Sequence, residues 1–203
     1  MTNEERLERL FRSLDTLDHI DVNDIPKIDL YMDQVTTFME NRLGAMKRYE
    51  DDKILTKTMI NNYAKNNLLP SPVKKKYTQE HIILLIFIYY FKNLLNFTDI
   101  ETILSYITAN HFGEDHLSLA DVYTEVFTLE HQQMENLKKD VKEKLDFASQ
   151  SFQNVEDEAA QRDLQLFAFI CELGFDVYLK KLAIEMLIDK IREEHPVEKK
   201  KKK

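Results

Sequence analysis

Residues 56–78 read TKTMINNYAKNNLLPSPVKKKYT, a run in which one helical segment ends and another begins. Thr56 is a good N-cap, so the pattern predicts a helix from there to about Asn66. Asn67 tolerates the left-handed conformation that ends helices, and the Leu-Leu-Pro-Ser-Pro that follows forces an extended turn. Thr78 is the predicted N-cap of a long apolar helix, and Thr98 of a shorter one. The pattern therefore indicates helices joined by a proline-stiffened turn.

The predicted helix has two unlike faces when successive residues are placed about 100° apart. One face is apolar and holds Met59, Ile60, Tyr63 and Ala64. The opposite face carries hydroxyl, amide and ammonium groups but no carboxylate, on Thr58, Asn61, Asn62 and Lys65. Amides can read adenine edges in the major groove of DNA, while Lys and Thr contact phosphates or bases. We interpret this helix as a DNA reader, because an ordinary solvated face usually mixes Glu with Lys.

Charge is unevenly distributed along the chain. The net charge is −8, yet residues 53–79 hold six lysines and no Asp or Glu, so this window is +6 and the remainder is −14. A compact basic island in an acidic protein suits phosphate contact, and Lys74–Lys76 can straddle a phosphate backbone as a wing does. A solvated loop that merely lacks acids remains the alternative. The candidate DNA-contacting residues are Thr56, Lys57, Thr58, Asn61, Asn62, Tyr63, Lys65, Lys74, Lys75, Lys76 and Tyr77.

This part of the chain resembles the MerR-like winged helix-turn-helix. INNYAKNNLL at 60–69, PSP, KKKYT and the helix to Leu95 are similar to that family's pattern, in which a wing closing in Tyr-Thr precedes an apolar helix. The matching residues are Ile60, Tyr63, Leu68, Leu69, Pro70 or Pro72, Tyr77, Thr78, Phe97 and Thr98. Asn61 and Asn62 stand where the family has Arg and Tyr, and Asn67 replaces Gly. The resemblance implies a recognition helix followed by a wing.

A second resemblance covers about residues 25–110. DLYMDQVTTFM, LTKTMINNYAKNNLLPSP, KKKYTQEHI and LIFIYYFKNLL are similar to a family of Gram-positive bacteria catalogued as domain of unknown function number eighteen-thirty-six. That resemblance implies a bacterial MerR-like DNA-binding domain and, by analogy, a transcriptional regulator. It implies no catalytic residues and no known ligand.

Few residues in this chain break helices. Three glycines and four prolines stand among 203 residues rich in Leu, Lys, Glu and Ile, which favours long helices over sheets. The longest apolar run, IILLIFIYYF at 82–91, is shorter than the ~20 residues of a membrane-spanning helix, so we expect a buried central helix and no membrane partner. The lone Cys171 excludes an internal disulfide and suits a reducing cytoplasm. The predicted fold class is all-α, a MerR-like winged helix-turn-helix domain followed by a long C-terminal helical hairpin.

Two long helical stretches are predicted beyond Gly113, at about 118–152 and 156–194. The second is apolar almost all round and the chain has little left to cover it, so a second copy is the expected cover. The predicted homodimer interface comprises Leu164, Phe167, Phe175, Tyr178, Leu182 and Met186. The predicted domains are an N-terminal helical segment (1–24), the MerR-like DNA-binding domain (25–110), a helical dimerisation domain (111–195) and a disordered lysine tail (196–203).

No residue pattern indicates chemistry. His111 and His116 match no zinc spacing, so a polar loop is favoured over a metal site, and Cys171 is interpreted as a buried apolar residue rather than a redox sensor. No Ser-His-Asp set, phosphate loop, HExxH or Rossmann fingerprint occurs, so we expect no enzyme activity, cofactor or metal. Whether a small-molecule effector binds stays open. The alternative function is a helical protein-interaction or adaptor module with a degenerate winged helix, favoured by Asn61 and Asn62.

Overall fold

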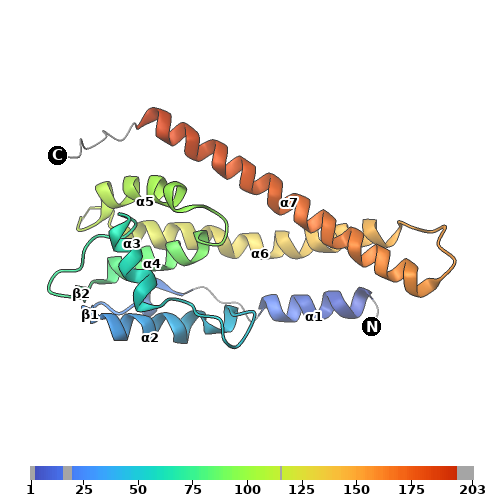
Figure 1. Ribbon diagram of the computed structural model, residues 1–203, viewed down its shortest axis with the longest axis horizontal. Helices are drawn as coiled ribbons and strands as arrows, with labels where there is room; N and C mark the ends of the chain where they lie inside the picture. Colours follow the sequence, from blue (N-terminus) through green and yellow to red (C-terminus); the bar gives the residue numbers. More distant parts are fainter. Residues whose placement is uncertain (1–2, 16–19, 115, 196–203) are drawn as a thin grey trace. The chain divides into compact units, whose positions relative to one another are not determined.

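Helices make up most of the protein in the computed structural model, which describes residues 3–15, 20–114 and 116–195 (Figure 1). The elements in chain order are α1 (Asn3–Asp15), the 3-10 helix η1 (Val22–Asp24), β1 (Leu30–Tyr31), α2 (Met32–Leu43), the 3-10 helix η2 (Gly44–Met46), α3 (Lys57–Lys65), β2 (Lys76–Tyr77), α4 (Gln79–Phe91), α5 (Phe97–His111), α6 (Leu119–Ser149) and α7 (Glu158–Glu194). β1 and β2 form a two-stranded antiparallel ladder. The expected all-α class is confirmed.

The described residues pack into two units. The hairpin unit takes its residues from 1–18 and 126–182, and therefore contains α1 and most of α6 and α7. The core unit takes its residues from 19–125 and 183–203, and therefore contains α2 to α5, the start of α6 and the end of α7. These boundaries differ from the expected breaks after residues 24 and 110, because α6 and α7 are continuous helices shared by both units and no loop marks the change. The expected lysine tail, 196–203, lies outside the described residues.

The centre of the core unit is α4. Its sequence, QEHIILLIFIYYF, is apolar on every side, and a helix with such a surface must be covered all round. The buried residues are His81, Ile82, Ile83, Leu84, Leu85, Ile86 and Ile88. Both α5 and β2 contact this helix. Within the described ranges, no helix combines the length and the apolar character needed to cross a membrane.

The first turns of α6 also belong to the core unit. Leu119 and Tyr123 are buried, and the Tyr123 hydroxyl donates a hydrogen bond to the Ile20 carbonyl at 2.6 Å. The ring of Tyr123 packs edge-on against Phe87 of α4, with ring centroids 5.7 Å apart. The sequence analysis placed this segment in the dimerisation domain, because neither contact leaves a local sign in the sequence.

Helix ends follow local sequence signals. Thr56 caps α3 as predicted, since its Oγ1 accepts a hydrogen bond from the Met59 N–H at 3.2 Å. Asn67 is left-handed as predicted, with a φ of 57°. The cap of α5 differs from the prediction, because Asn96 Oδ1 accepts from the Asp99 N–H at 3.0 Å and the helix begins at Phe97. Thr98, the predicted cap, therefore lies inside the first turn.

In the hairpin unit, α6 and α7 pack around a small apolar cluster with α1 beside it. The buried members are Val141, Leu145, Ala148 and Phe169, and Leu7 and Phe11 of α1 pack against them. Gln165 of α7 is buried, and its amide donates to the carbonyls of Ser149 and Ser151 at 2.9 and 3.1 Å. The last carbonyls of a helix have no partners within it, and this side chain satisfies the carbonyl of Ser149, the last residue of α6.

Candidate nucleic-acid interface

The outward face of α3 is polar and free of carboxylates. Thr58, Asn61, Asn62 and Lys65 are all exposed on this nine-residue helix. Ile60 lies on the opposite face and is fully buried. The four exposed side chains span about 10 Å along the helix axis, which is within the reach of one major groove about 12 Å wide. The face therefore has the size and the chemistry of a base-reading surface.

The inner face of α3 is fixed by packing. The ring of Tyr63 lies edge-on to Phe97 of α5, with centroids 6.1 Å apart and planes at 80°. The Leu68 N–H donates to the Tyr63 carbonyl at 2.9 Å, and Leu68 and Leu69 are buried beyond the end of the helix. Burying such side chains contributes roughly 1.5–3 kcal/mol each, so the outward residues stand on a rigid support.

Three predicted DNA-contacting residues support the face rather than belong to it. Tyr63 and Tyr77 are only 3% and 4% exposed, and burial raises the pKa of both hydroxyls. Tyr77 packs edge-on against His81, with ring centroids 5.6 Å apart. The hydroxyl oxygen of Thr56 is used to cap α3. The prediction of direct contact is corrected for the two tyrosines, because their large apolar bodies are buried in the core.

A tight turn joins Val73 to β2. The Lys76 N–H donates to the Val73 carbonyl at 3.0 Å, and both residues between them, Lys74 and Lys75, have positive φ, at 51° and 64°. Two successive left-handed residues are typical of a type I′ hairpin turn, in which Asn-Gly is favoured. A lysine Cβ crowds this conformation, at a cost of roughly 1–2 kcal/mol per residue. Strain of this kind is concentrated at functional sites, which makes the turn a candidate contact.

Strand pairing holds the turn in place. Leu30 lies opposite Tyr77 and Tyr31 opposite Lys76 in the ladder of β1 and β2. The ammonium of Lys76 lies over the Tyr31 ring, 5.8 Å from its centroid. Lys74 and Lys75 are exposed at the tip. The lysine triplet is therefore divided, with one member on the ladder and two directed to solvent.

One of the six lysines in the basic window, residues 53–79, is paired with a carboxylate from outside it. Lys57, the first residue of α3, forms an ion pair with Asp33 of α2. Lys65, Lys74 and Lys75 have no ion pair within the described part of the chain. The sequence analysis missed Asp33 because it lies in another predicted helix, and only the fold brings the two residues together. The cations available to a phosphate are thus mainly at the end of α3 and in the turn.

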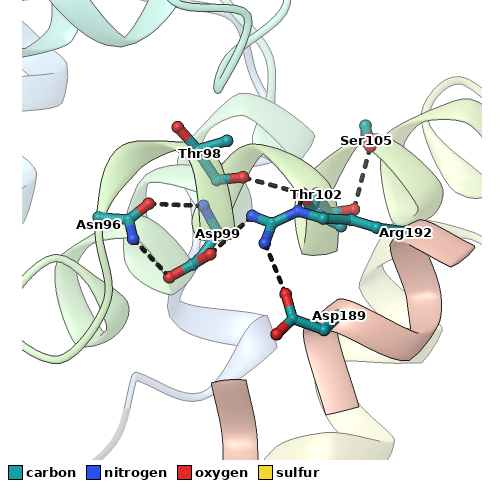
Figure 2. A network of polar contacts seen from close by, with 7 residues as sticks. All are labelled: Asn96, Thr98, Asp99, Thr102, Ser105, Asp189 and Arg192. Atoms are coloured by element: carbon teal, nitrogen blue, oxygen red, sulfur yellow. Dashed lines mark hydrogen bonds and ion pairs between the residues drawn. The ribbon is translucent and has the colours of Figure 1, made fainter. Parts of the chain in front are cut away.

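A second polar cluster in the core unit joins the end of α7 to the start of α5 (Figure 2). Arg192 donates to Asp99 Oδ1 at 2.6 Å and to Thr102 Oγ1 at 3.1 Å. The amide of Asn96 donates to the other oxygen of Asp99 at 2.7 Å. The hydrogen bond to Asp99 raises the pKa of Arg192. Arg192 also pairs with Asp189 of α7 at 3.0 Å. No local pattern predicts the link to α5, because Arg192 and Asp99 are 93 residues apart.

The predicted dimer-interface residues all lie exposed on α7. Their side chains are between 37% and 64% exposed: Leu164, Phe167, Phe175, Tyr178, Leu182 and Met186. Apolar surface gathered in this way usually marks an interaction site.

Cys171 and the histidines were also singled out in the sequence. Cys171, interpreted from the sequence as a buried apolar residue, is half-buried. Nδ1 of His111 lies 2.9 Å from the Leu117 carbonyl oxygen, within the loop that follows α5. Among the residues that the structure describes, no group of three or more His, Cys, Asp or Glu is arranged to hold a metal ion.

Comparison with known proteins adds a family but no activity. A family model described as a domain of unknown function (DUF1836) matches residues 20–127, more than half of the chain. The matched range includes α2, α3, the lysine turn, α4, α5 and the first turns of α6, and so the whole candidate surface. No curated protein and no solved structure gives a significant match.

Proposed function

The chain belongs to the DUF1836 family, and we propose that it binds specific double-stranded DNA as a homodimeric transcriptional regulator. One observation carries the proposal: the exposed face of α3 bears two amides, a hydroxyl and an ammonium without any carboxylate, and a strained lysine turn follows it in the chain. Hydrogen-bonding side chains on a short helix read base edges, and lysines bind phosphates.

The order of the elements supports a MerR-like winged helix-turn-helix. In this assignment α2 and α3 are the helix pair, α3 is the recognition helix, and the turn at 73–76 with β2 is the wing. β1, which precedes α2, pairs with the wing strand and ties it to the helix pair. The connector between α2 and α3, residues 44–56, is longer than the usual three- or four-residue turn, yet α2 and α3 remain in contact.

The proposed docking assigns each group a task. With α3 in the major groove, Asn61 and Asn62 face base edges, while Lys65, Lys74 and Lys75 contact phosphates. Two protomers present two readers, so we expect two half-sites about one helical turn, ~34 Å, apart. The acidic remainder of the chain limits nonspecific attraction to DNA.

Selection of bound fragments from genomic DNA with the purified full chain tests the proposal. Affinity for a selected duplex and for its shuffled counterpart is then measured by fluorescence anisotropy at about 50 and 200 mM salt. Three lysine–phosphate contacts per protomer, six in the dimer, predict a loss of about a thousandfold over that range. Equal, weak and salt-insensitive binding to both duplexes would contradict the proposal.

The competing function is a helical adaptor module. It is favoured by the net charge of −8 and by the ion pair between Lys57 and Asp33, since both weaken the attraction for phosphates. An adaptor predicts that no sequence is enriched and that the matched and shuffled duplexes behave alike. The same measurement therefore separates the two functions.

A further inference from the structure

Within the hairpin unit, α7 has two opposite apolar sides and only one of them is covered. Gln165 and Phe169 face α6 and are buried, and Asp176 lies on the same side, 3.8 Å from Lys144 of α6. The opposite side exposes six large apolar residues, each between 37% and 63% exposed. We name it the outer face of α7; its members are Leu164, Phe167, Ile170, Val177, Tyr178 and Leu182.

Gly174 lies in the middle of this face. At about 100° per residue it falls between Ile170 and Tyr178, one turn to either side. It is exposed, and a Cβ at this position would meet no heavy atom within 4 Å among the described residues beyond the helix's own backbone. Glycine is the poorest helix former after proline, and nothing within the described chain requires it here. Because glycine has no Cβ, another backbone can approach the helix closely at this position.

We infer that the outer face of α7 receives a second copy of this chain, and that the two α7 helices cross in antiparallel orientation at Gly174. This inference deepens the homodimer of the proposed function and rests on a surface separate from α3. A two-fold axis through Gly174 brings this residue against its own copy. It also brings Ile170 level with Tyr178 of the second copy along the helices. The bulky side chains of each copy then lie on both sides of the close contact between the two glycines.

The area of the face reaches the lower end of what a stable dimer requires. Six large apolar residues exposed to these extents offer on the order of 600 Å² per chain, or about 1,200 Å² over two copies. Specific interfaces bury about 1,200–2,000 Å² in total. An isologous contact uses the same patch on both copies, so one face of this size is sufficient for both partners.

A local crossing fits the sequence better than a long coiled coil. The seam of a coiled coil would run through Leu164, Phe167, Cys171, Gly174 and Tyr178, and its next position is Lys181. It therefore lasts about two heptads, whereas a coiled coil needs three to four. Two helices that pack at a shallow angle of about 20° keep this face in contact along its length and approach most closely at the crossing point, where the glycine lies.

The first test replaces Gly174 with leucine. Gly174→Leu raises helix propensity and meets no clash within the chain, so a purely internal role predicts equal or higher thermal stability and an unchanged dimer. The crossing predicts a dimer Kd at least tenfold higher by sedimentation equilibrium, without DNA. Gly44→Leu is the matched control, since a Cβ at Gly44 also meets nothing within 4 Å, and its Kd should not change.

The second test uses the single cysteine of the chain. In the crossed dimer the two Cys171 residues are about 9 Å apart along the helices, beyond the ~7 Å between Cα atoms that a disulfide tolerates. Wild-type protein should therefore form no disulfide-linked dimer on mild oxidation, while Cys171→Ser/Gly174→Cys should form one. A monomeric mass at micromolar concentration, or a dimer that neither cross-links at position 174 nor responds to Gly174→Leu, would overturn the inference. Because no DNA is present, either result leaves the DNA-binding proposal to its own test.

Discussion

Arg192 and Asp99 meet through a hydrogen bond of 2.6 Å in the core unit, although 93 residues separate them in the chain. Asp99 also accepts a hydrogen bond from Asn96, the cap of α5, so the last turns of α7 are anchored where α5 begins (Figure 2). The first residue of α5, Phe97, packs against Tyr63 on the inner side of α3. The end of α7 is therefore linked to the proposed DNA reader through two adjacent contacts.

Removal of Arg192 should destabilise the core unit. Arg192→Ala leaves Asp99, only 6% exposed, without its cationic partner, and we expect a loss of about 1–3 kcal/mol in the free energy of unfolding. Asp99→Asn should restore part of that loss in the double variant, because a neutral amide is less costly to bury. Urea unfolding of the two single variants and the double variant measures the coupling, which should exceed about 0.5 kcal/mol.

The control for this cycle is Arg162→Ala on the same helix. Arg162 pairs with Glu158 one turn away, and both side chains are exposed, so the change should be within about 0.5 kcal/mol. An Arg192→Ala variant that behaves like the Arg162→Ala control would show that the cluster contributes nothing to stability.

Features set by neighbouring residues could be predicted from the sequence. The two faces of α3 follow from helical periodicity, the Thr56 cap from its hydroxyl, and the left-handed Asn67 from the tolerance of asparagine for that conformation. The exposed apolar residues of α7 follow from the same periodicity, since a helix that is apolar almost all round cannot be covered by so short a chain.

Features set by tertiary contact could not be predicted. The ion pair of Lys57 with Asp33 joins two helices. The choice of Asn96 over Thr98 as the cap of α5 depends on which side chain reaches the Asp99 N–H. The backbone of Lys74 and Lys75 is left-handed against lysine's own preference, so local propensity predicts a different conformation. The boundaries between the two units fall within the continuous helices α6 and α7, so no linker sequence marks them.

Acid should weaken the core unit through His81. This residue is 2% exposed between Tyr77 and Phe112, and burial lowers its pKa below the ordinary value of 6.5, outweighing the Pro70 carbonyl and Asp29, which raise it. The folded state therefore disfavours the protonated form, and stability present above pH 6.5 is lost as the pH falls below that value. Urea unfolding at about pH 7.5 and 5.5 should show the loss. His81→Phe keeps a ring between the two aromatics and should reduce the difference between the two pH values; an unchanged difference would assign it to other groups.

Substitutions on α3 and in the lysine turn should have different effects on binding to the selected and the shuffled duplex. Asn61→Ala removes an amide from the α3 face, so it should cost about 1–3 kcal/mol on the selected duplex and little on a shuffled one. Lys75→Ala should weaken both duplexes alike and reduce the salt slope by about 1 per protomer. Lys139→Ala, an exposed lysine in the hairpin unit, is the control and should change neither. If Asn61→Ala weakens binding to both duplexes equally, α3 is not the reader.

Substitutions of Lys75 should show that the turn favours DNA affinity at a cost in folding stability. Lys75→Gly and Lys75→Ala both remove the ammonium, so both should lose the same phosphate contact and the same part of the salt slope. Only glycine relieves the crowding at the positive φ of 64°, so Lys75→Gly should be about 1 kcal/mol more stable than Lys75→Ala in urea unfolding. A stable variant that binds DNA more weakly is the result expected when strain is retained for function. Equal stability of the two variants would mean that the turn stores no strain, and wild-type affinity in both would remove Lys75 from the DNA contact.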